Sequence, residues 1–285
     1  MIDLQSIKSL QVEATTKCNA WCPGCGRNNQ GYNLIPQLEL VDLSISRLQE
    51  VLLSLSKLDL IDFCGTFGDA IAAQNICDLV NVAKQHCKKI IIRTNGSLRN
   101  TAWWIEFAKL LKDAEHEVWF CLDGLEDTHS IYRQATDWQT IINNATSFIN
   151  NNGTAVWQFI PFQHNQHQIK DCIRMSQSLG FKRFEFYKDV RLNFIPKNYK
   201  TGKIYEIKPW DRNNSMSKYV KIKSKVQLND CRHLAEPSIY LNANGTISTC
   251  CFFNLSKSVN QFDQLPDMLM ELKNPSNICL HHCGS

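Results

Sequence analysis

Six short apolar, β-branched runs alternate along the chain with longer segments of helical periodicity. This alternation is typical of a parallel α/β protein, because each helix carries the chain back to begin the next strand in the same direction. The predicted strands are 10–14, 60–64, 89–94, 118–123, 155–161 and 183–187. The predicted helices are 42–55, 72–87, 101–114, 138–151 and 169–179, and Gly180 is expected to follow the last of them as its C-cap.

Six strand–helix units are fewer than the eight of a closed barrel, so the predicted fold class is α/β with a partial (β/α)6 TIM-like barrel. The site of such a barrel lies at the C-terminal ends of its strands. After about residue 191 the alternation stops. A predicted β-hairpin then follows, with strands 238–241 and 246–250, and a short helix at 265–272. We therefore predict two domains, a barrel over 1–195 and a small C-terminal hairpin and helix domain over 196–285.

The chain length suits one barrel with an appendage, since 285 residues can bury a large core. No segment is long and apolar enough to span a membrane, and Met1–Lys8 lacks the features of a signal peptide. The 13 cysteines fit metal ligation in a reducing cytosol better than a secreted disulfide framework. These features predict a cytoplasmic protein with no membrane partner.

Charge is unevenly spread along the chain. The net charge of +4 is too small to indicate a nucleic-acid partner. Between Lys197 and Lys225, however, nine Lys and Arg residues stand against only Glu206 and Asp211. This stretch either holds an acidic substrate or is a solvated linker between domains, and the linker is the more common case.

Three cysteines follow the first predicted strand, at the edge where the site is expected. Cys18, Cys22 and Cys25 can bind three irons of a 4Fe–4S cluster and leave the fourth iron without a protein ligand. Structural iron–sulfur sites usually have four cysteines, and structural zinc sites are closed in the same way. An open metal position therefore indicates a reactive centre. The alternatives are a zinc knuckle or three buried thiols.

The C-x3-C-x2-C spacing, with Trp21 just before the second cysteine, resembles the cluster loop of the radical S-adenosylmethionine (radical SAM) enzymes. In that family the open iron binds the amino and carboxylate groups of SAM, and an electron from the cluster splits SAM to give a 5′-deoxyadenosyl radical. The resemblance implies a 4Fe–4S cluster on Cys18, Cys22 and Cys25, with SAM as a second cofactor. It also implies a flavodoxin- or ferredoxin-type electron donor and a place for Trp21 near the adenine.

Two further strand ends resemble the same family. Gly65–Asp69 is similar to its Gly-Gly-Glu-Pro segment, with an aspartate in place of the glutamate, which implies that Gly68 and Asp69 bind the SAM ammonium group. The alternative is that Asp69 only caps a helix. Asn95, in the run Thr-Asn-Gly after the third strand, is implied to lie near the ribose.

The fourth strand ends in Cys121, Leu122, Asp123 and Gly124, with His129 and Arg133 further on. This stretch resembles the Ser-x-Asp-Gly…His-x-x-x-Arg stretch of radical SAM enzymes with auxiliary clusters. The resemblance implies that Asp123 and Arg133 line the SAM side and that the Arg133 guanidinium pairs with the SAM carboxylate. Cys121 replaces the usual serine. It is either a catalytic thiol that donates a hydrogen atom to a substrate radical or, as for most free cysteines, a small buried apolar side chain.

The C-terminal cysteines form a second set. Cys231, Gly245 and Cys250 have the C-x13-G-x4-C spacing and resemble the opening of the SPASM and twitch domains. The resemblance implies one auxiliary 4Fe–4S cluster, completed by Cys279 and Cys283, with Cys251 as an alternative to Cys279. The competing interpretation is a zinc site with four cysteine ligands, or with His281 or His282 in place of one of them.

Together these motifs predict a radical SAM enzyme that abstracts hydrogen from a substrate and modifies a peptide or protein side chain by crosslinking, epimerisation or oxidation. A sugar or nucleotide metabolite is the alternative substrate, and a non-catalytic zinc-binding protein is the rival function. Only 17 residues precede Cys18, so we expect no N-terminal leader-peptide recognition domain. A peptide substrate would then need a separate binding protein.

Overall fold

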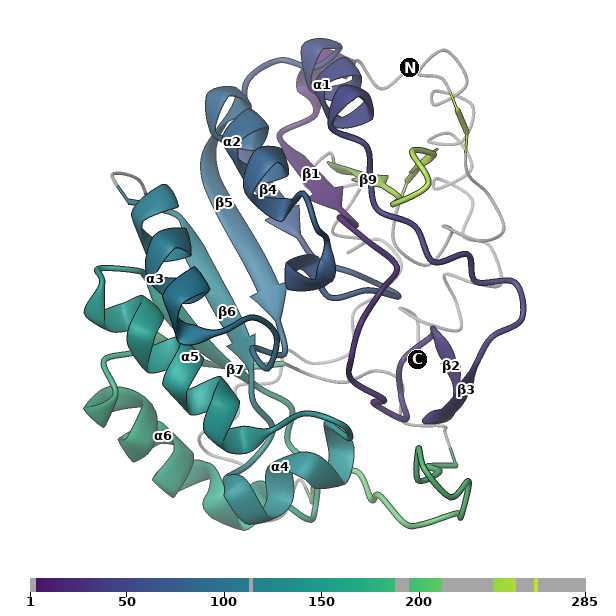
Figure 1. Ribbon diagram of the computed structural model, residues 1–285, viewed down its shortest axis with the longest axis vertical. Helices are drawn as coiled ribbons and strands as arrows, with labels where there is room; N and C mark the ends of the chain where they lie inside the picture. The colour runs from purple at the N-terminus through teal and green to yellow at the C-terminus, as the bar shows by residue number, and fades with distance from the viewer. Residues whose placement is uncertain (1–3, 113–114, 188–194, 212–237, 250–258, 261–285) are drawn as a thin grey trace. The chain divides into compact units, whose positions relative to one another are not determined.

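The computed structural model describes residues 4–112, 115–187, 195–211, 238–249 and 259–260. The chain divides into two compact units (Figure 1). The first unit comprises the described parts of Met1–Lys17, Leu40–Ile92 and Lys223–Ser285, and the second comprises those of Cys18–Glu39 and Arg93–Ile222. Each unit is built from strands with helices packed on them.

The strands of the first unit lie in the order β10-β9-β1-β4-β5. Strand β1 pairs in parallel with β4 on one side and with β9 on the other, and only β10 runs antiparallel, beside β9. Leu10, Val12, Ile61 and Phe63 are fully buried, which explains why these apolar runs form central strands. The bounds are β1 (Ser9–Val12), β4 (Leu58–Phe63), β5 (Cys87–Thr94), β9 (Ser238–Leu241) and β10 (Ile247–Ser248).

Two α-helices cover one side of these strands (Figure 1). Helix α1 (Ile45–Leu53) begins at Ser44, whose side chain accepts a hydrogen bond from the backbone N–H of Arg47 at 3.2 Å. Helix α2 (Ile76–His86) follows the turn after β4 and buries Leu79 and Val80. Two 3-10 helices complete the unit, η1 (Leu4–Ser6) and η2 (Ala70–Ala72).

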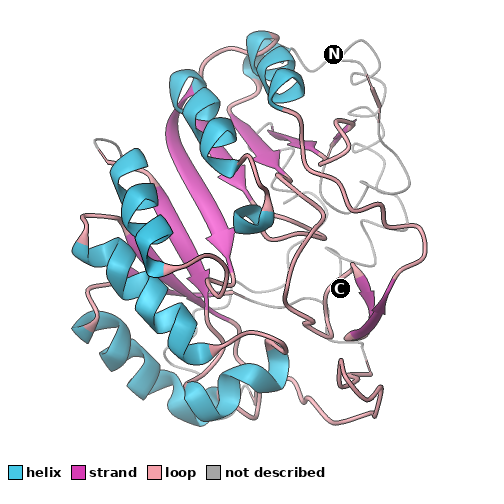
Figure 2. Cartoon of the chain, in the orientation of Figure 1, coloured by secondary structure: helices cyan, strands magenta, loops and turns pink. Residues whose placement is uncertain are grey.

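The second unit contains three parallel strands in the order β6-β7-β8 and a separate antiparallel pair, β2 with β3. Figure 2 distinguishes its helices from its strands. The strands are β2 (Asn28–Asn29), β3 (Tyr32–Leu34), β6 (Glu117–Cys121), β7 (Ala155–Phe159) and β8 (Arg183–Phe186). The helices are α3 (Thr101–Leu110), α4 (Glu126–Tyr132), α5 (Trp138–Asn150), η3 (Gln166–Gln168) and α6 (Ile169–Ser178).

An aromatic core holds these helices on the strands. The Trp104 ring lies 5.1 Å from Phe120 on β6 and 5.8 Å from Phe148 on α5, measured between ring centroids. All three side chains are fully buried. Helices α3 and α5 begin at capping residues Asn100 and Asp137, each of which accepts a backbone N–H three residues ahead. Burial and capping together hold α3 and α5 against β6, at whose C-terminal end Cys121 lies.

The predicted parallel α/β class is confirmed, and each of the six predicted strands and five predicted helices has an observed counterpart. Gly180 follows α6 with a φ of +86°, as the C-cap prediction requires. Helix α4 and the β2–β3 pair were not predicted. The hairpin of β9 and β10 was predicted, but its parallel pairing with β1 was not.

The boundary at residues 195 and 196 stays a prediction, as does the C-terminal iron–sulfur domain. Helix 265–272 lies outside the described residues. Within the described part of the chain, no helix is both long and apolar enough to cross a membrane.

Candidate functional site

The cysteine loop, Cys18 to Cys25, begins the second unit and follows β1 in the sequence after five residues. Cys22 is buried, and Cys18 and Cys25 are partly buried. The loop turns tightly, since the backbone N–H of Cys25 donates to the carbonyl of Cys22 at 3.0 Å. The side chain of Asn28 donates to the same carbonyl at 3.2 Å. These bonds hold the second and third cysteines on one compact turn.

Two of the three sulfur atoms receive N–H groups from neighbouring elements. Asn95, after β5, donates from Nδ2 to Cys18 Sγ at 3.7 Å, and Arg133, after α4, donates from Nη1 to Cys22 Sγ at 3.8 Å. Burial raises the pKa of the Cys22 thiol to about 11, while Arg133 acts in the opposite direction. Without a metal the buried thiol therefore keeps its proton, which a metal ligand must release.

A buried arginine lies inside the cysteine loop. Arg27 is 4% exposed, and its Nη1 donates to the carbonyls of Cys18 and Ala20 at 2.9 and 3.1 Å. Its guanidinium carbon lies 5.5 Å from the ring centroid of Trp21. The Nε atom of Arg27 is buried without a hydrogen-bond partner within the described residues. The loop thus holds a cation and an unused donor beside its thiols.

The donor chemistry of this loop fits a group that carries negative charge on sulfur. Three thiols, one buried guanidinium and two side-chain N–H donors to sulfur are the features that stabilise bound thiolates. Among the residues that the structure describes, no set of three or more Cys, His, Asp or Glu side chains is arranged to hold a metal ion. The fit therefore rests on the donors, and the ligand assignment stays a prediction.

Arg133 is held by a buried carboxylate. Its Nε donates to Asp123 Oδ2 at 2.6 Å, and the side chains are 15% and 0% exposed, respectively. The negative charge of Asp123 keeps the pKa of Arg133 well above its ordinary value, although burial alone would lower it. The pair brings together two predicted residues and places one end of the guanidinium at the Cys22 sulfur.

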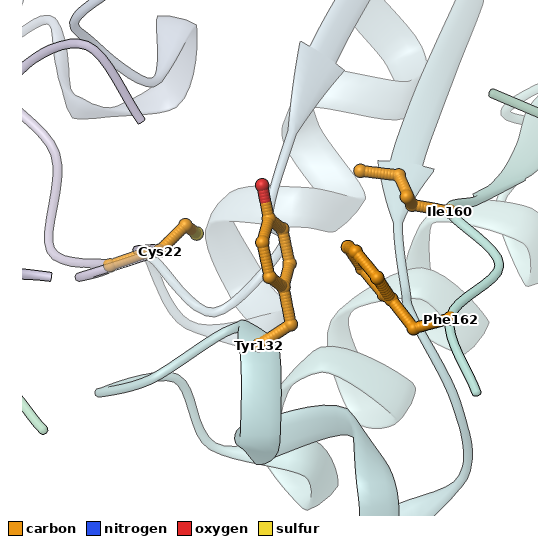
Figure 3. Packing of buried hydrophobic residues seen from close by; sticks show 5 residues of the cluster. Cys22, Tyr132, Ile160 and Phe162 are labelled. Carbon is orange, nitrogen blue, oxygen red and sulfur yellow. The ribbon is translucent and has the colours of Figure 1, made fainter. Parts of the chain in front are cut away.

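Apolar side chains surround the middle of the cysteine loop. Figure 3 shows the Tyr132 ring between Cys22 on one side and Ile160 and Phe162 on the other. The Tyr132 and Phe162 rings lie 4.8 Å apart, and both side chains are 1% exposed. This packing keeps water from one side of Cys22.

The segment 195–211 contacts the same loop, which the sequence did not predict. Gln134, just after α4, donates from Nε2 to Tyr205 Oη at 2.8 Å. Its backbone carbonyl accepts the N–H of Trp21 in the cysteine loop at 2.9 Å. Tyr205 in turn donates to the Ile131 carbonyl at 2.7 Å. Ile207 packs against the apolar cluster of Cys22. The basic stretch therefore begins with residues that cover the cysteine loop, and its binding of an acidic substrate stays a prediction.

Gly68 and Asp69 lie in the first unit. Asp69 accepts the N–H of Ile71 at 3.0 Å and so caps η2, which is the helix-capping alternative from the sequence. The space at Gly68 is closed, because a Cβ there would lie 1.7 Å from the Thr15 carbonyl oxygen. The predicted role of both residues toward SAM stays a prediction.

A buried glutamate that the sequence did not single out holds the same turn. Glu13 Oε1 accepts the N–H groups of Phe67 and Gly68 at 2.7 and 3.4 Å. Burial raises the pKa of Glu13 to about 7, although the backbone hydrogen bonds favour the ionised form. On the other side of the turn, Tyr240 of β9 contacts the backbone N–H of Thr66 at 3.2 Å. In the sequence, the only feature that could have singled out Glu13 is its place as a charged residue at the end of an apolar predicted strand.

Cys121 ends β6 and is 7% exposed. Its Sγ lies 3.9 Å from the Trp119 carbonyl oxygen. This placement is compatible with both predicted roles, the catalytic thiol and the buried apolar side chain. Cys231, Cys250, Cys279 and Cys283 lie outside the described residues, as do Cys251, His281 and His282.

The chain matches no protein-family model and no curated protein. Its fold is nevertheless shared by solved structures of radical SAM enzymes. The first is native anSMEcpe with bound AdoMet, at 14% sequence identity and a TM-score of 0.62, covering 96% of this chain and 82% of that one. At this identity the similarity establishes the fold alone.

Two further neighbours are structures of enzymes with peptides. Native anSMEcpe with bound AdoMet and Cp18Cys peptide matches at 15% identity and a TM-score of 0.59, over 96% of this chain and 82% of that one. Streptococcus suis SuiB bound to precursor peptide SuiA matches at 13% identity and a TM-score of 0.54. That match covers 97% of this chain and 65% of SuiB.

Proposed function

We propose that this protein is a radical SAM enzyme that abstracts hydrogen from a peptide or protein side chain. The observation that carries the proposal is the cysteine loop, in which two predicted SAM-site residues, Asn95 and Arg133, donate N–H groups to two of the three sulfurs. The fold shared with radical SAM enzymes supports the same function.

The residues of the second unit would hold the cofactors as follows. Cys18, Cys22 and Cys25 ligate a 4Fe–4S cluster, which, when bound, supplies the electron that splits SAM into methionine and a 5′-deoxyadenosyl radical. Arg133 presents a cation to the SAM carboxylate, and Asp123 keeps that cation charged and in place. Tyr132 and the other apolar neighbours of Cys22 exclude water, which protects a radical from side reactions.

Trp21 and the first-unit residues Gly68 and Asp69 belong to the same proposal. Trp21 packs near the adenine, and the Gly65–Asp69 turn supplies acceptors for the SAM ammonium group. Cys231, Cys250, Cys279 and Cys283 bind one auxiliary 4Fe–4S cluster of the SPASM or twitch type. A flavodoxin- or ferredoxin-type protein donates the electron.

A peptide substrate is supported by the neighbours that were solved with peptides. The described basic residues of 195–211 lie on the segment that covers the cysteine loop, which favours an acidic peptide over a neutral one. A sugar or nucleotide remains the alternative substrate. Incubation of the reduced enzyme with SAM in D2O, with candidate peptides in one series and sugars or nucleotides in another, separates the two. Crosslinking and oxidation change the mass of the true substrate directly, and epimerisation changes it by one solvent deuterium.

Replacing one ligand tests the metal assignment. In Cys22→Ala, iron and sulfide after anaerobic reconstitution should fall by about four per chain, while the C-terminal cysteines keep their cluster. Cys77→Ala is the matched control, because Cys77 is a partly buried cysteine of α2 in the first unit and should leave the iron content unchanged. Unchanged iron in Cys22→Ala, or stoichiometric zinc in the wild type, would reject the cluster.

Cys121 has a proposed role of its own, as the thiol that donates a hydrogen atom to the substrate radical. The S–H bond breaks as the new C–H bond forms, and the thiyl radical left on Cys121 takes one electron from the flavodoxin- or ferredoxin-type donor and one proton from solvent to restore the thiol. Cys121→Ala should then still cleave SAM but no longer place solvent deuterium in the product when the reaction runs in D2O. Deuterium incorporation equal to that of the wild type would leave Cys121 as a buried apolar side chain.

A further inference from the structure

Asp123 is held at four points, two on its backbone and two on its carboxylate. Its backbone N–H donates to His129 Nδ1 at 3.2 Å, and its carbonyl accepts Asn165 Nδ2 at 3.1 Å. Oδ1 accepts the backbone N–H of Ile160 at 2.7 Å, and Oδ2 accepts Arg133 Nε at 2.6 Å. The direction of the carboxylate, and with it that of the Arg133 guanidinium, depends on these four bonds.

The hydrogen bonds of His129 define its tautomer. Nδ1 accepts the Asp123 N–H and therefore carries no proton. Nε2 lies 3.1 Å from Thr136 Oγ1, and the Thr136 hydroxyl donates to the Arg133 carbonyl at 2.6 Å. Since the hydroxyl proton is used there, the Thr136 oxygen accepts from Nε2–H. Both ends of the ring require the same neutral form.

The surroundings of the ring keep this form. Burial, together with the smaller effect of the positive charge of Arg133, lowers the pKa of His129 to about 3. The Trp138 ring packs against the imidazole of His129, with the two ring centroids 5.4 Å apart. The His129 backbone carbonyl also accepts the N–H of Arg133 at 3.0 Å.

We propose that His129 is a positioning residue for Arg133. One ring nitrogen holds the backbone of Asp123, and the other, through Thr136, holds the backbone of Arg133. The two partners of the buried ion pair are thus tied to one rigid ring, which keeps Arg133 Nη1 directed at the Cys22 sulfur. The effect of this positioning on SAM binding rests on the proposed function, but the positioning of Arg133 by His129 does not.

Four substitutions separate the two halves of this arrangement. The amide oxygen of His129→Asn can accept the Asp123 N–H, but the side chain is too short to reach Thr136. The longer amide of His129→Gln can donate to Thr136 but offers no acceptor at the Nδ1 position. His129→Ala removes both, and Thr136→Val removes the Nε2 partner while leaving the ring in place.

Hydrogen exchange of the Arg133 Nε–H, followed by NMR in the full-length chain without cluster, is the primary readout. We expect exchange about tenfold faster in His129→Ala, as for an ion pair weakened by about 1.4 kcal/mol. His129→Asn, His129→Gln and Thr136→Val should fall between this variant and the wild type. Equal exchange in all three His129 variants, or exchange in His129→Ala within twofold of the wild type, would overturn the proposal. If His129→Ala does not fold, Thr136→Val and His129→Asn decide the question.

Two further measurements complete the test. The ring ¹⁵N shifts of His129 should show a bare Nδ1 and a protonated Nε2 between pH 5 and pH 8, whereas a protonated Nδ1 contradicts the proposal. In reconstituted protein, the Kd for SAM should rise about tenfold in His129→Ala, with the Asn and Gln variants in between. If the wild type binds no SAM, the proposed function fails, while the exchange data still decide the role of His129.

Discussion

At the scale of single residues, the ion pair of Asp123 and Arg133 is the most consequential interaction of the second unit. A buried pair adds little net stability, but removal of one partner leaves an uncompensated charge in the protein interior. Asp123 is fully buried and Arg133 nearly so, so neither charge is solvated by bulk water. The pair therefore makes the strand end after β6 sensitive to single substitutions.

Asp123→Ala should lower the free energy of unfolding by about 3–5 kcal/mol, since Arg133 would stay buried without its counterion. Urea denaturation of both proteins measures this change. Glu106→Ala is the control, because Glu106 pairs with Lys109 on an exposed face of α3 and its loss should cost less than about 1 kcal/mol. Equal changes in the two variants would contradict the buried-charge explanation.

Glu13 predicts a second residue-scale effect, on the pH dependence of stability. Its pKa is raised from 4.5 to about 7 in the folded chain, so the folded state binds this proton more tightly than the unfolded state. The resulting stabilisation is complete below pH 4.5 and is lost as the pH rises through 7.

In Glu13→Gln this contribution is absent, so the free energy of unfolding should fall less steeply between pH 4.5 and pH 7 than in the wild type. The difference between the curves should amount to about 3 kcal/mol over this interval. Denaturation at a series of pH values measures both curves. Parallel curves would mean that Glu13 titrates in the fold as it does in water.

The sequence motifs identified Asp123, Arg133 and Asn95, and the structure places all three in the second unit with the cysteine loop. The sequence motifs did not identify Glu13 or Arg27, because a single charged residue within an apolar or polar run gives no periodic signal. The role of Glu13 follows from a hydrogen bond to the backbone of Phe67, which is far away in the sequence. The role of Arg27 follows from a hydrogen bond to the Cys18 carbonyl, which only the folded loop brings into reach. A motif names residue types, whereas these partners depend on the folded backbone.

At the scale of elements, the turn after β4 requires glycine at position 68, because the Thr15 backbone leaves no space for a side chain there. The Cβ of any residue but glycine at position 68 would overlap the Thr15 carbonyl. Gly68→Ala should therefore cost about 3 kcal/mol of unfolding free energy, because backbone must move. Gly202→Ala is the matched control: its φ of +67° is strained for alanine, but its nearest neighbour atom is 3.4 Å away, so about 1 kcal/mol is expected.

Thermal denaturation of Gly68→Ala and Gly202→Ala distinguishes the two causes. A larger loss in Gly202→Ala would mean that backbone conformation, rather than space, controls these turns.

Elements with strong patterns were predictable and short ones were not. The six parallel strands were found because apolar residues recur along each of them, in β8 alternating with Arg183 and Glu185, and the five helices because each has a buried stripe. Helix α4 spans only seven residues and Leu125 provides no side-chain cap, so it shows no long period, and Glu126 and Asp127 in its first turn are a weak start signal by themselves. The partner of β9 was also hidden, since β1 precedes it by more than 220 residues.

At the scale of the whole molecule, β9 links the C-terminal part of the chain to the N-terminal strand. All four residues of β9 are buried, and they pair with Ser9–Val12 in register. A chain of residues 1–195 therefore lacks one neighbour of β1 and exposes that strand edge. We expect this fragment to aggregate or to melt well below the full-length protein. A soluble fragment with an unchanged melting temperature would instead support an independent domain that ends at residue 195.

The most direct test of the proposed function is 5′-deoxyadenosine formation from SAM by the reconstituted, dithionite-reduced protein, measured by mass spectrometry. The wild type and Cys77→Ala should form 5′-deoxyadenosine, and Cys22→Ala should form none. Equal formation in Cys22→Ala and the wild type, or none in a wild type that holds its iron and sulfide, would contradict the assignment of this protein as a radical SAM enzyme.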